Sequence, residues 1–205
     1  MPNSAIPPLQ LLPLHQFLAQ TAAKTPTPGG GAVACVTGAL AAALGQMVVN
    51  YSVGKKNLAE FEPSLRDAVA RLERARGLLM QLADEDAAAY GAVNELSRLP
   101  EWDPRRVAEL PDAQAASVQV PLATAAACVD LLRLFQQLVA ITNKHLLSDL
   151  RIAAILADAG VRASGCNVLV NTASLPGEQQ TSGKGALAAL VAESGRLLGL
   201  IEASA

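Results

Sequence analysis

The sequence predicts an all-α fold, a single-domain helical bundle whose helices approach one another closely. Of its 205 residues, 51% are hydrophobic but only 3% are aromatic. Alanine, which β-strands disfavour, dominates together with leucine. A core with so few rings has to be filled by Ala, Leu and Val, which favours helix packing or a large subunit interface. The length fits one domain, residues 1–205, in which residues 1–8 are expected to be loose.

The composition also excludes several classes of function. A net charge of −2 and few aromatic rings argue against nucleic-acid binding, because phosphates attract cations and bases stack on rings. Cys35, Cys128 and Cys166 are widely spaced and form no metal or redox motif. We therefore predict no metal site and expect a reducing, cytoplasmic location. No lysine or arginine precedes Lys24 and no cleavage pattern follows, so no signal peptide is predicted.

One stretch resembles a membrane span. No charged residue lies between Lys24 and Lys55, and Gly29–Val49 is long enough to cross a bilayer. It consists mostly of small residues, contains Gln46, and has no second span to accompany it. We interpret it as a helix buried in the core or at a dimer interface, and predict no membrane partner.

Apolar spacing, glycine and proline predict the helices of the first half of the chain. A helix over about Leu14–Lys24 is broken by the Thr/Pro/Gly segment 25–31. A second helix follows to about Tyr51, where Gly54 ends it. The long pattern Glu62–Leu99 is a third helix, with proline near its start and just after its end.

The second half is predicted in the same way. Residues Glu101–Pro111 are expected to connect the third helix to a fourth, Asp112–Thr142, kinked at Pro121. Another helix covers about Lys144–Ala163. By local pattern alone Asn167–Ala173 is compatible with a strand or a helix. The Gly/Pro/Ser/Thr-rich segment Pro176–Lys184 is predicted as a loop before a last helix, Gly185–Ser204.

The glycine triplet Gly29, Gly30 and Gly31 is the first candidate binding element. At a helix start, glycines leave backbone N–H groups open to a ligand, and the helix dipole favours an anion. Small residues then recur every three or four positions, so one helix face has almost no side-chain bulk. We interpret that face, made of Gly31, Cys35, Gly38, Ala42 and Gly45, as a tight helix contact.

Asp86 is the first candidate for chemistry. It lies three residues after Ala83 and four before Tyr90, on the apolar stripe of the third helix, whereas Asp84 and Glu85 turn away from that stripe. A carboxylate facing a core must be paired, hydrogen-bonded or protonated. In a cleft such a group has a raised pKa and suits acid–base catalysis. In a closed core it would instead bond a neighbouring helix, and both interpretations stay open at this point.

Two further polar groups stand out. Asp149 shares a helix face with Leu146 and Ala153, so a second acid is expected to point inward, while Asn143 is also a helix-capping candidate. The pair Lys55 and Lys56 follows the uncharged helix. It either complements the helix dipole or binds a carboxylate on a ligand.

Together these segments resemble the cyclodeaminase domain of formiminotransferase-cyclodeaminase and its small bacterial relatives, the methenyltetrahydrofolate cyclohydrolases. The resemblance runs from about Phe17 to about Leu200 and rests on the order and spacing of several motifs. These are Pro26–Gly31 with its small-residue helix, Gly54-Lys55-Lys56, Asp84–Tyr90, Leu99-Pro100, Val120-Pro121-Leu122, Asn143 with Ser148-Asp149, and Asn167–Asn171.

The resemblance implies a fold and an activity. It implies an all-α homodimer and favours a helix at Asn167–Asn171. The implied reaction converts 5-formiminotetrahydrofolate to 5,10-methenyltetrahydrofolate and ammonia. The alternative reaction hydrolyses 5,10-methenyltetrahydrofolate to 10-formyltetrahydrofolate. Neither needs a metal or an organic cofactor beyond the folate substrate, polyglutamylated forms included.

The resemblance also assigns residues. It implies that Asp86 is the catalytic aspartate. It places a larger set around the folate, with the lysines or the glycine amides as candidates for the glutamate tail. This set consists of Gly29, Gly30, Gly31, Lys55, Lys56, Tyr90, Asn143, Ser148, Asp149, Asn167 and Asn171.

A competing hypothesis is a non-catalytic helical dimer, a scaffold that kept the fold. It predicts that Asp86 is bonded within the core and that no cleft surrounds it. The enzyme hypothesis predicts a cleft at Asp86 bordered by Asn143, Asp149 and a basic residue.

Overall fold

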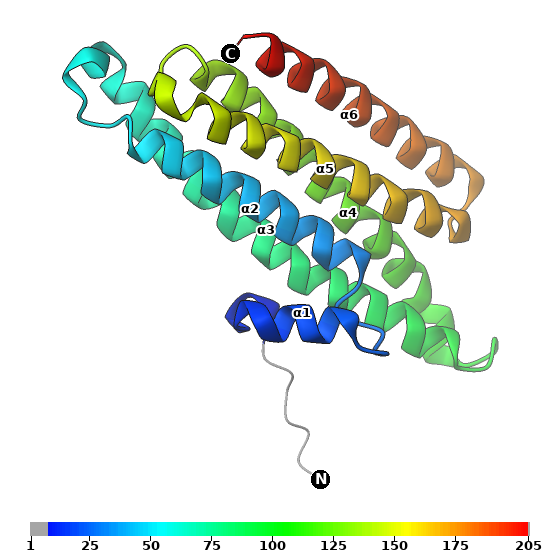
Figure 1. Cartoon of the computed structure of the whole chain (residues 1–205). Helices are drawn as coiled ribbons and strands as arrows, with labels where there is room; N and C mark the ends of the chain where they lie inside the picture. The colour runs from blue at the N-terminus through cyan, green and yellow to red at the C-terminus, as the bar shows by residue number, and fades with distance from the viewer. Residues whose placement is uncertain (1–7, 205) are drawn as a thin grey trace.

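The computed structural model describes residues 8–204, and in this range every regular element is a helix (Figure 1). The predicted all-α class is therefore confirmed. Of the segment 1–8 expected to be loose, only Pro8 is among the described residues. The elements are η1 Leu9–Leu11, α1 Leu14–Ala22, α2 Gly30–Asn50, η2 Lys56–Phe61, α3 Glu62–Ser97, α4 Pro104–Leu138, η3 Lys144–Leu146, α5 Leu147–Asn171, η4 Thr172–Ser174 and α6 Gly177–Ala203.

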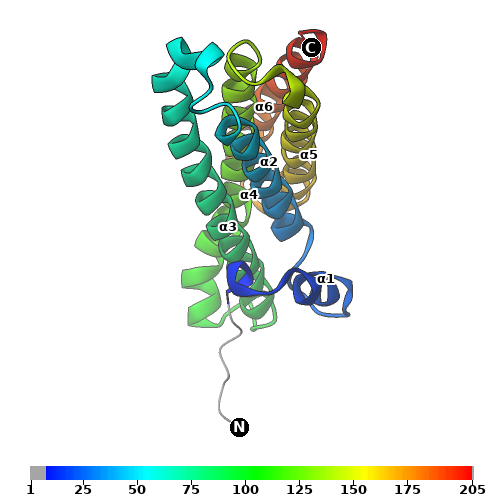
Figure 2. The same ribbon diagram turned by 60° about the vertical axis from the view of Figure 1, so that its left-hand side comes forward.

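Four long helices form the body of the molecule. Helices α2, α3, α4 and α5 close into a ring in which each packs against the one before and the one after it, and α6 lies against α4 and α5 (Figures 1 and 2). Successive helices run in opposite directions, so this is an up-and-down bundle. Its core is made mostly of Ala, Leu and Val, as the composition predicts.

The helices differ in length, and this creates a step at one end of the bundle. Helix α2 has 21 residues, whereas α3 and α4 have 36 and 35. The C-terminal part of α3 and the N-terminal part of α4 therefore extend beyond the start of α2. Helix α1 and the loop leading to α2 lie across this end (Figure 2).

The small-residue face of α2 packs inside the chain. A Cβ atom at Gly38 would lie 2.7 Å from Cys128 Sγ and 3.2 Å from both terminal methyl groups of Leu79, and one at Gly45 would overlap the ring of Phe135. These are contacts with α3 and α4, so the interpretation as a tight helix contact is confirmed. Hydrogen atoms at these positions allow α2 to approach α3 and α4 closely.

The predicted connector Glu101–Pro111 is mostly helical. Helix α4 already begins at Pro104, because Asp103 caps it by accepting hydrogen bonds from the N–H groups of Arg105 and Arg106, at 2.8 and 3.4 Å. Proline at the first helical position lacks only an N–H that would have no partner there. Pro111 and Pro121 both lie inside the helix.

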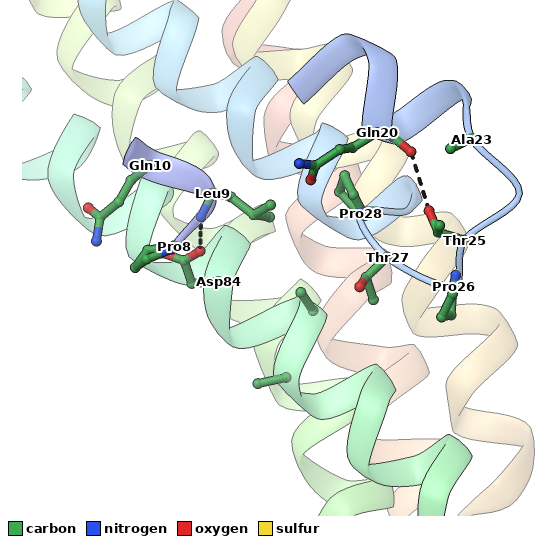
Figure 3. Close-up of a pocket in the computed structure, with 12 residues that line it drawn as sticks. Pro8, Leu9, Gln10, Gln20, Ala23, Thr25, Pro26, Thr27, Pro28 and Asp84 are labelled. Carbon is green, nitrogen blue, oxygen red and sulfur yellow. Dashed lines mark hydrogen bonds between the residues drawn. The ribbon is translucent and has the colours of Figure 1, made fainter. Parts of the chain in front are cut away.

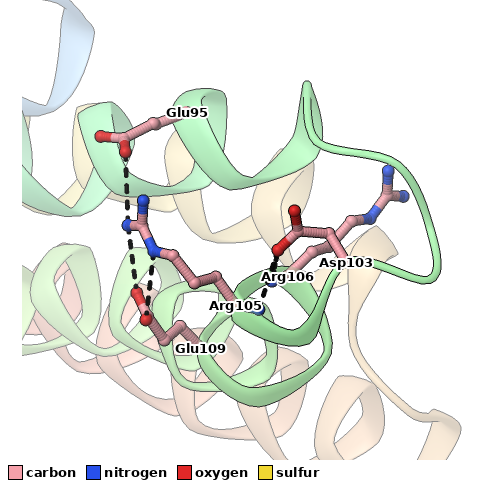
Figure 4. A network of polar contacts seen from close by, with 5 residues as sticks. All are labelled: Glu95, Asp103, Arg105, Arg106 and Glu109. Carbon is pink, nitrogen blue, oxygen red and sulfur yellow. Dashed lines mark hydrogen bonds and ion pairs between the residues drawn. The ribbon is translucent and has the colours of Figure 1, made fainter.

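Side chains at this turn tie α3 to α4. The Arg105 guanidinium contacts Glu95 at 3.3 Å and Glu109 at 3.4 Å (Figure 4). Arg106 donates to the carbonyl oxygen of Leu99 at 2.6 Å. The ion pairs are exposed and each contributes little on its own. The bond from Arg106 satisfies a carbonyl group just beyond the end of α3.

The C-terminal third also differs from the expectation. Helix α5 runs unbroken to Asn171, so the segment around Asn167 is helix, as the resemblance implies. The predicted loop Pro176–Lys184 is wrong, since α6 begins at Gly177. The low helix propensity of its glycines is offset by packing: Gly183 is buried, and a Cβ there would lie 3.2 Å from the Thr172 methyl group.

Three helical stretches are long and apolar enough to cross a membrane by length and composition: Gly30–Asn50, Pro104–Leu138 and Lys144–Ser174. The expectation that no second stretch of membrane-spanning length accompanies Gly29–Val49 is therefore wrong. The most apolar windows of these stretches are 56%, 44% and 50% buried within the bundle. About half of this apolar surface is thus used for packing helices against one another.

Because α2 packs closely against α3 and α4, replacing glycine by alanine is expected to change the stability of the protein in opposite directions at two positions. Gly38→Ala is expected to destabilise the protein by about 1–3 kcal/mol, because the added methyl group has no room beside Cys128. Gly77→Ala, on an exposed part of α3 with nothing within 4 Å of the added Cβ, should stabilise it by about 0.5–1 kcal/mol. Chemical denaturation measures both. An equal rise in stability for the two variants would contradict the tight contact.

Candidate functional site

A cavity of about 330 Å³ opens at the step, beside the first turn of α2. Its wall combines the loop before α2, two turns of α3, one residue of α4 and the last turns of α5. The lining residues are Pro26, Thr27, Gly29, Gly30, Gly31, Asp86, Tyr90, Ser117, Cys166, Asn167, Val170 and Asn171. Six of the residues that were predicted to bind substrate therefore line one cavity with Asp86, the predicted catalytic residue.

Asp86 lies where α3 passes the start of α2. Its half-buried carboxylate accepts a hydrogen bond from the backbone N–H of Ala32, one of the groups that the helix leaves without an internal partner. Burial raises the pKa of Asp86, and the bond from Ala32 opposes that rise. Because burial is the larger effect, the carboxyl group is a stronger base than an exposed aspartate.

Glycine is required where the carboxylate meets the helix. A Cβ atom at Gly31 would overlap the carboxyl group of Asp86. One at Gly30 would lie 3.6 Å from Oδ1 of Asn167. The glycine at position 31 therefore lets the acid of α3 reach the backbone of α2, and the one at position 30 leaves the amide of α5 close by.

Two asparagines on α5 complete the polar part of the wall. Asn171 Nδ2 donates to the carbonyl oxygen of Ser117 on α4 at 2.7 Å, and Asn167 Nδ2 donates to that of Ala163 at 3.2 Å. Both side chains are half-buried, and these bonds hold their amides in place at the cavity. Tyr90, one turn after Asp86 on α3, is 47% exposed and stands at the rim.

Neutral polar groups lie deeper in the bundle on the helices that form the cavity. Cys35 Sγ and Thr124 Oγ1 are 3.2 Å apart, and burial raises the pKa of Cys35 to about 11 and of Cys128 to about 12. Both thiols are therefore protonated at neutral pH. Cys35 and Cys128 thus serve as small buried residues of the core, whereas Cys166 is exposed and lines the cavity.

The remaining predicted site residues lie at the opposite end of the bundle. Lys55 and Lys56 follow the C-terminus of α2, about 30 Å along its axis from Gly30. Asn143 caps η3 by accepting from the His145 N–H at 3.3 Å, and Ser148 and Asp149 occupy the first turn of α5. Within one chain, the predicted cleft bordered by Asn143, Asp149 and a basic residue is not formed. Asp149 is half-buried, and Ser148 is exposed.

The sequence patterns missed several lining residues. Pro26, Thr27 and Ser117 come from the loop and α4, and nothing in their local spacing marks them. Cys166 and Val170 of α5 could have been found, because they directly precede Asn167 and Asn171 and repeat the same i, i+4 spacing.

Asp84 also departs from the expectation. It was predicted to turn away from the core, but it is half-buried and accepts a hydrogen bond from the backbone N–H of Leu9 at 2.6 Å. The stripe of α3 alone could not indicate that the N-terminal segment folds back over this helix.

Comparison with known proteins identifies the family of the chain. The family model described as formiminotransferase-cyclodeaminase matches residues 13–182. A methenyltetrahydrofolate cyclohydrolase of Methylorubrum extorquens is 34% identical over 166 residues, covering 79% of this chain and 80% of that protein. The formimidoyltransferase-cyclodeaminase of Mus musculus is 33% identical over 162 residues, covering 77% of this chain and 30% of the mouse protein. The matched region is thus under a third of that longer relative.

A solved structure matches nearly the whole chain. The crystal structure of formiminotetrahydrofolate cyclodeaminase from Thermotoga maritima has a TM-score of 0.89 and 30% sequence identity, and the match covers 96% of each chain. The helix order and the resemblance inferred from the sequence motifs are therefore confirmed together. The chain belongs to the formiminotransferase-cyclodeaminase family.

Proposed function

We propose that this protein is a formiminotetrahydrofolate cyclodeaminase in which Asp86 moves the proton. The observation that carries the proposal is a carboxyl group with a raised pKa, half-buried in a cavity at a helix start. The match over 96% of both chains with a structure of that activity supports the same choice. The scaffold hypothesis predicted no cleft at this position.

The reaction needs one group that takes and returns a proton. The formimino group on N5 is an amidine and enters the reaction as its protonated cation, with an NH2 nitrogen. N10 of the substrate attacks the carbon of this group, and a new C–N bond closes the five-membered ring. The carboxylate of Asp86 takes the proton from N10 and then delivers it to the formimino nitrogen. The bond from that nitrogen to carbon breaks, ammonia leaves and 5,10-methenyltetrahydrofolate remains. Holding N5 and N10 in attack geometry supplies a further part of the acceleration.

The polar wall supplies recognition in this proposal. The amides of Asn167 and Asn171, the N–H groups of the glycine turn and the hydroxyl of Tyr90 bind the pterin and its attached carbon unit. No metal and no organic cofactor besides the folate takes part, no nucleic acid or membrane is a partner, and the protein works in the cytoplasm.

Hydrolysis of 5,10-methenyltetrahydrofolate is the second candidate. A relative of nearly the same length, 34% identical, carries that activity in its name. Here the Asp86 carboxylate takes a proton from the water that attacks the methenyl carbon. The new hydroxyl group then loses its proton to solvent as the carbonyl group forms, and the bond from that carbon to N5 breaks. Asp86 returns its proton to N5, which gives 10-formyltetrahydrofolate.

A homodimer is part of the proposal. Helices α2 and α5 lie together on one side of the bundle (Figure 1), and α2 carries no charged residue from Gly30 to Asn50. Large apolar side chains remain exposed on these two helices, and such patches mark association sites. They are Val33, Leu40, Ile152, Ile155, Leu169 and Val170.

A two-fold axis near the middle of α2 would explain why the predicted site residues are divided between two ends. The two copies of α2 would then be antiparallel. The C-terminal end of α2 in one copy, with Lys55 and Lys56, would lie beside the N-terminal end of α2 in the other, with Gly30. The same relation would bring Asn143, Ser148 and Asp149 toward the partner's cavity. The lysines would then be placed for a carboxylate of the folate tail.

The absorbance of 5,10-methenyltetrahydrofolate tests the reaction. We expect the purified protein to form it from 5-formiminotetrahydrofolate, with release of one ammonia per turnover. Asp86→Asn should lower kcat by about 10²–10⁴ with little change in KM, because the amide cannot carry the proton.

The outcomes separate the hypotheses. Accelerated loss of 5,10-methenyltetrahydrofolate without formation from the formimino compound would identify the cyclohydrolase. If Asp86→Asn kept full activity, the assigned role of Asp86 would be wrong. If neither reaction were accelerated, the scaffold hypothesis would be favoured.

The raised pKa of Asp86 also predicts a pH dependence of stability. As pH rises, Asp86 ionises at a lower pH in the unfolded chain than in the folded protein, because folding raises its pKa. The free energy of unfolding therefore falls with pH between these two pKa values. Asp86→Asn removes this effect. The variant should therefore be the more stable protein at pH 7, and its advantage should vanish toward pH 3. A variant less stable than the wild type at pH 7 would show that the bond with Ala32 outweighs burial.

Leu40→Glu tests the dimer, because Leu40 is 54% exposed near the middle of α2. We expect the wild-type protein to sediment as two chains and this variant as one, since a charge at the centre of an apolar interface is costly. Leu78→Glu, at a leucine of α3 that is 48% exposed, is the control and should remain dimeric. A monomeric wild type, or a dimeric Leu40→Glu variant, would contradict this interface.

A further inference from the structure

A second and larger cavity lies beside the Asp86 cavity. Figure 3 shows the residues that line it. Its volume is about 710 Å³, and it is enclosed by the N-terminal segment, α1, the loop before α2 and one face of α3. Its lining residues are Pro8, Leu9, Gln10, Gln20, Ala23, Thr25, Pro26, Thr27, Pro28, Asp84, Ala87 and Ala88.

The two cavities adjoin one another. Pro26 and Thr27 border both, so they share one short stretch of the loop. On α3, Ala87 and Ala88 of the larger cavity directly follow Asp86 of the smaller one. Successive residues of an α-helix point about 100° apart, so Ala88 faces almost opposite to Asp86 and Ala87 lies between them. A ligand group that leaves the acid therefore reaches the larger cavity around α3, beneath Pro26 and Thr27.

The wall of the larger cavity suits an uncharged ring. Proline, alanine and leucine make up most of it. Its carboxylate, Asp84, already accepts a hydrogen bond from the backbone N–H of Leu9 (Figure 3). The remaining polar side chains are neutral: the amides of Gln10 and Gln20, and threonines. Flat apolar walls with a few neutral polar groups are typical of sites for aromatic ligands.

The substrate of the proposed reaction has such a ring next to the reacting atom. N10 of tetrahydrofolate is bonded directly to the benzene ring of the p-aminobenzoyl group. If N10 lies at Asp86, this ring must lie one bond away. The Asp86 cavity, at about 330 Å³, is at the lower end of the range for a drug-sized ligand. It is suited to the pterin rather than to the whole folate.

We propose that the larger cavity binds the p-aminobenzoyl ring of the substrate, with Ala87 and Ala88 as its floor and the loop Pro26–Pro28 as its wall. The inference rests on the proposed function. It adds the N-terminal segment, with its tie from Leu9 to Asp84, to the substrate-binding site.

Filling the floor of the cavity tests the proposal. Ala88→Leu should raise KM for the folate substrate by about tenfold or more and leave kcat within about twofold, because the added side chain occupies the place of the ring without touching Asp86. Ala108→Leu, at an exposed alanine of α4 that lines neither cavity, is the matched control and should keep the wild-type KM. Circular dichroism and melting curves confirm that both variants are folded.

Binding of p-aminobenzoyl-L-glutamate alone, measured by calorimetry, gives a second readout that needs no turnover. We expect it to bind the wild type and the Ala108→Leu variant and to bind Ala88→Leu at least about tenfold more weakly. An active enzyme whose KM is unchanged by Ala88→Leu would overturn this cavity assignment and leave the proposed function standing. A wild type that binds the probe through Ala88 but catalyses neither reaction would overturn the proposed function instead.

Discussion

The contact between the Asp86 carboxylate and the first turn of α2 determines how the candidate site is built. Two opposite effects meet there. Burial favours the protonated acid, whereas the N–H of Ala32 and the positive end of the helix dipole favour the carboxylate. An acid held between these effects changes protonation state at small cost, which is what a group that takes and returns a proton requires. The contact depends on Gly31, since any side chain there would overlap the carboxyl group.

The rest of the bundle holds the first turn of α2 against Asp86 and forms the cavity around this contact. The glycines farther along α2 keep the helix close to α3 and α4, so its first turn is held against Asp86 rather than drifting outward. The greater length of α3 and α4 forms the step at which the cavity opens. The last turns of α5 close the cavity with Asn167 and Asn171.

Much of the fold follows from apolar spacing and breaker residues, and the errors have physical causes. The start of α4 was misplaced because Pro104 and Pro111 were both interpreted as breakers, although Asp103 before Pro104 is a strong start signal. The start of α6 was misplaced because tertiary packing at Gly183 overrides a weak local propensity. The position of Asp86 was predictable from its stripe on α3. That Lys55 and Asn143 lie at the other end was not, because helix spacing says nothing about which end of a bundle a distant segment occupies.

The most direct test of this account is the pKa of Asp86 in the folded protein. Carbon-13 NMR of the aspartate carboxyl groups, titrated with pH and assigned by comparison with the Asp86→Asn variant, measures it without substrate. The expected result is a pKa above that of an exposed aspartate, because burial outweighs the hydrogen bond from Ala32. An Asp86 pKa at or below that of an exposed aspartate would contradict the account, because the carboxylate would then be a hydrogen-bonded anchor of α2 and a poor proton carrier.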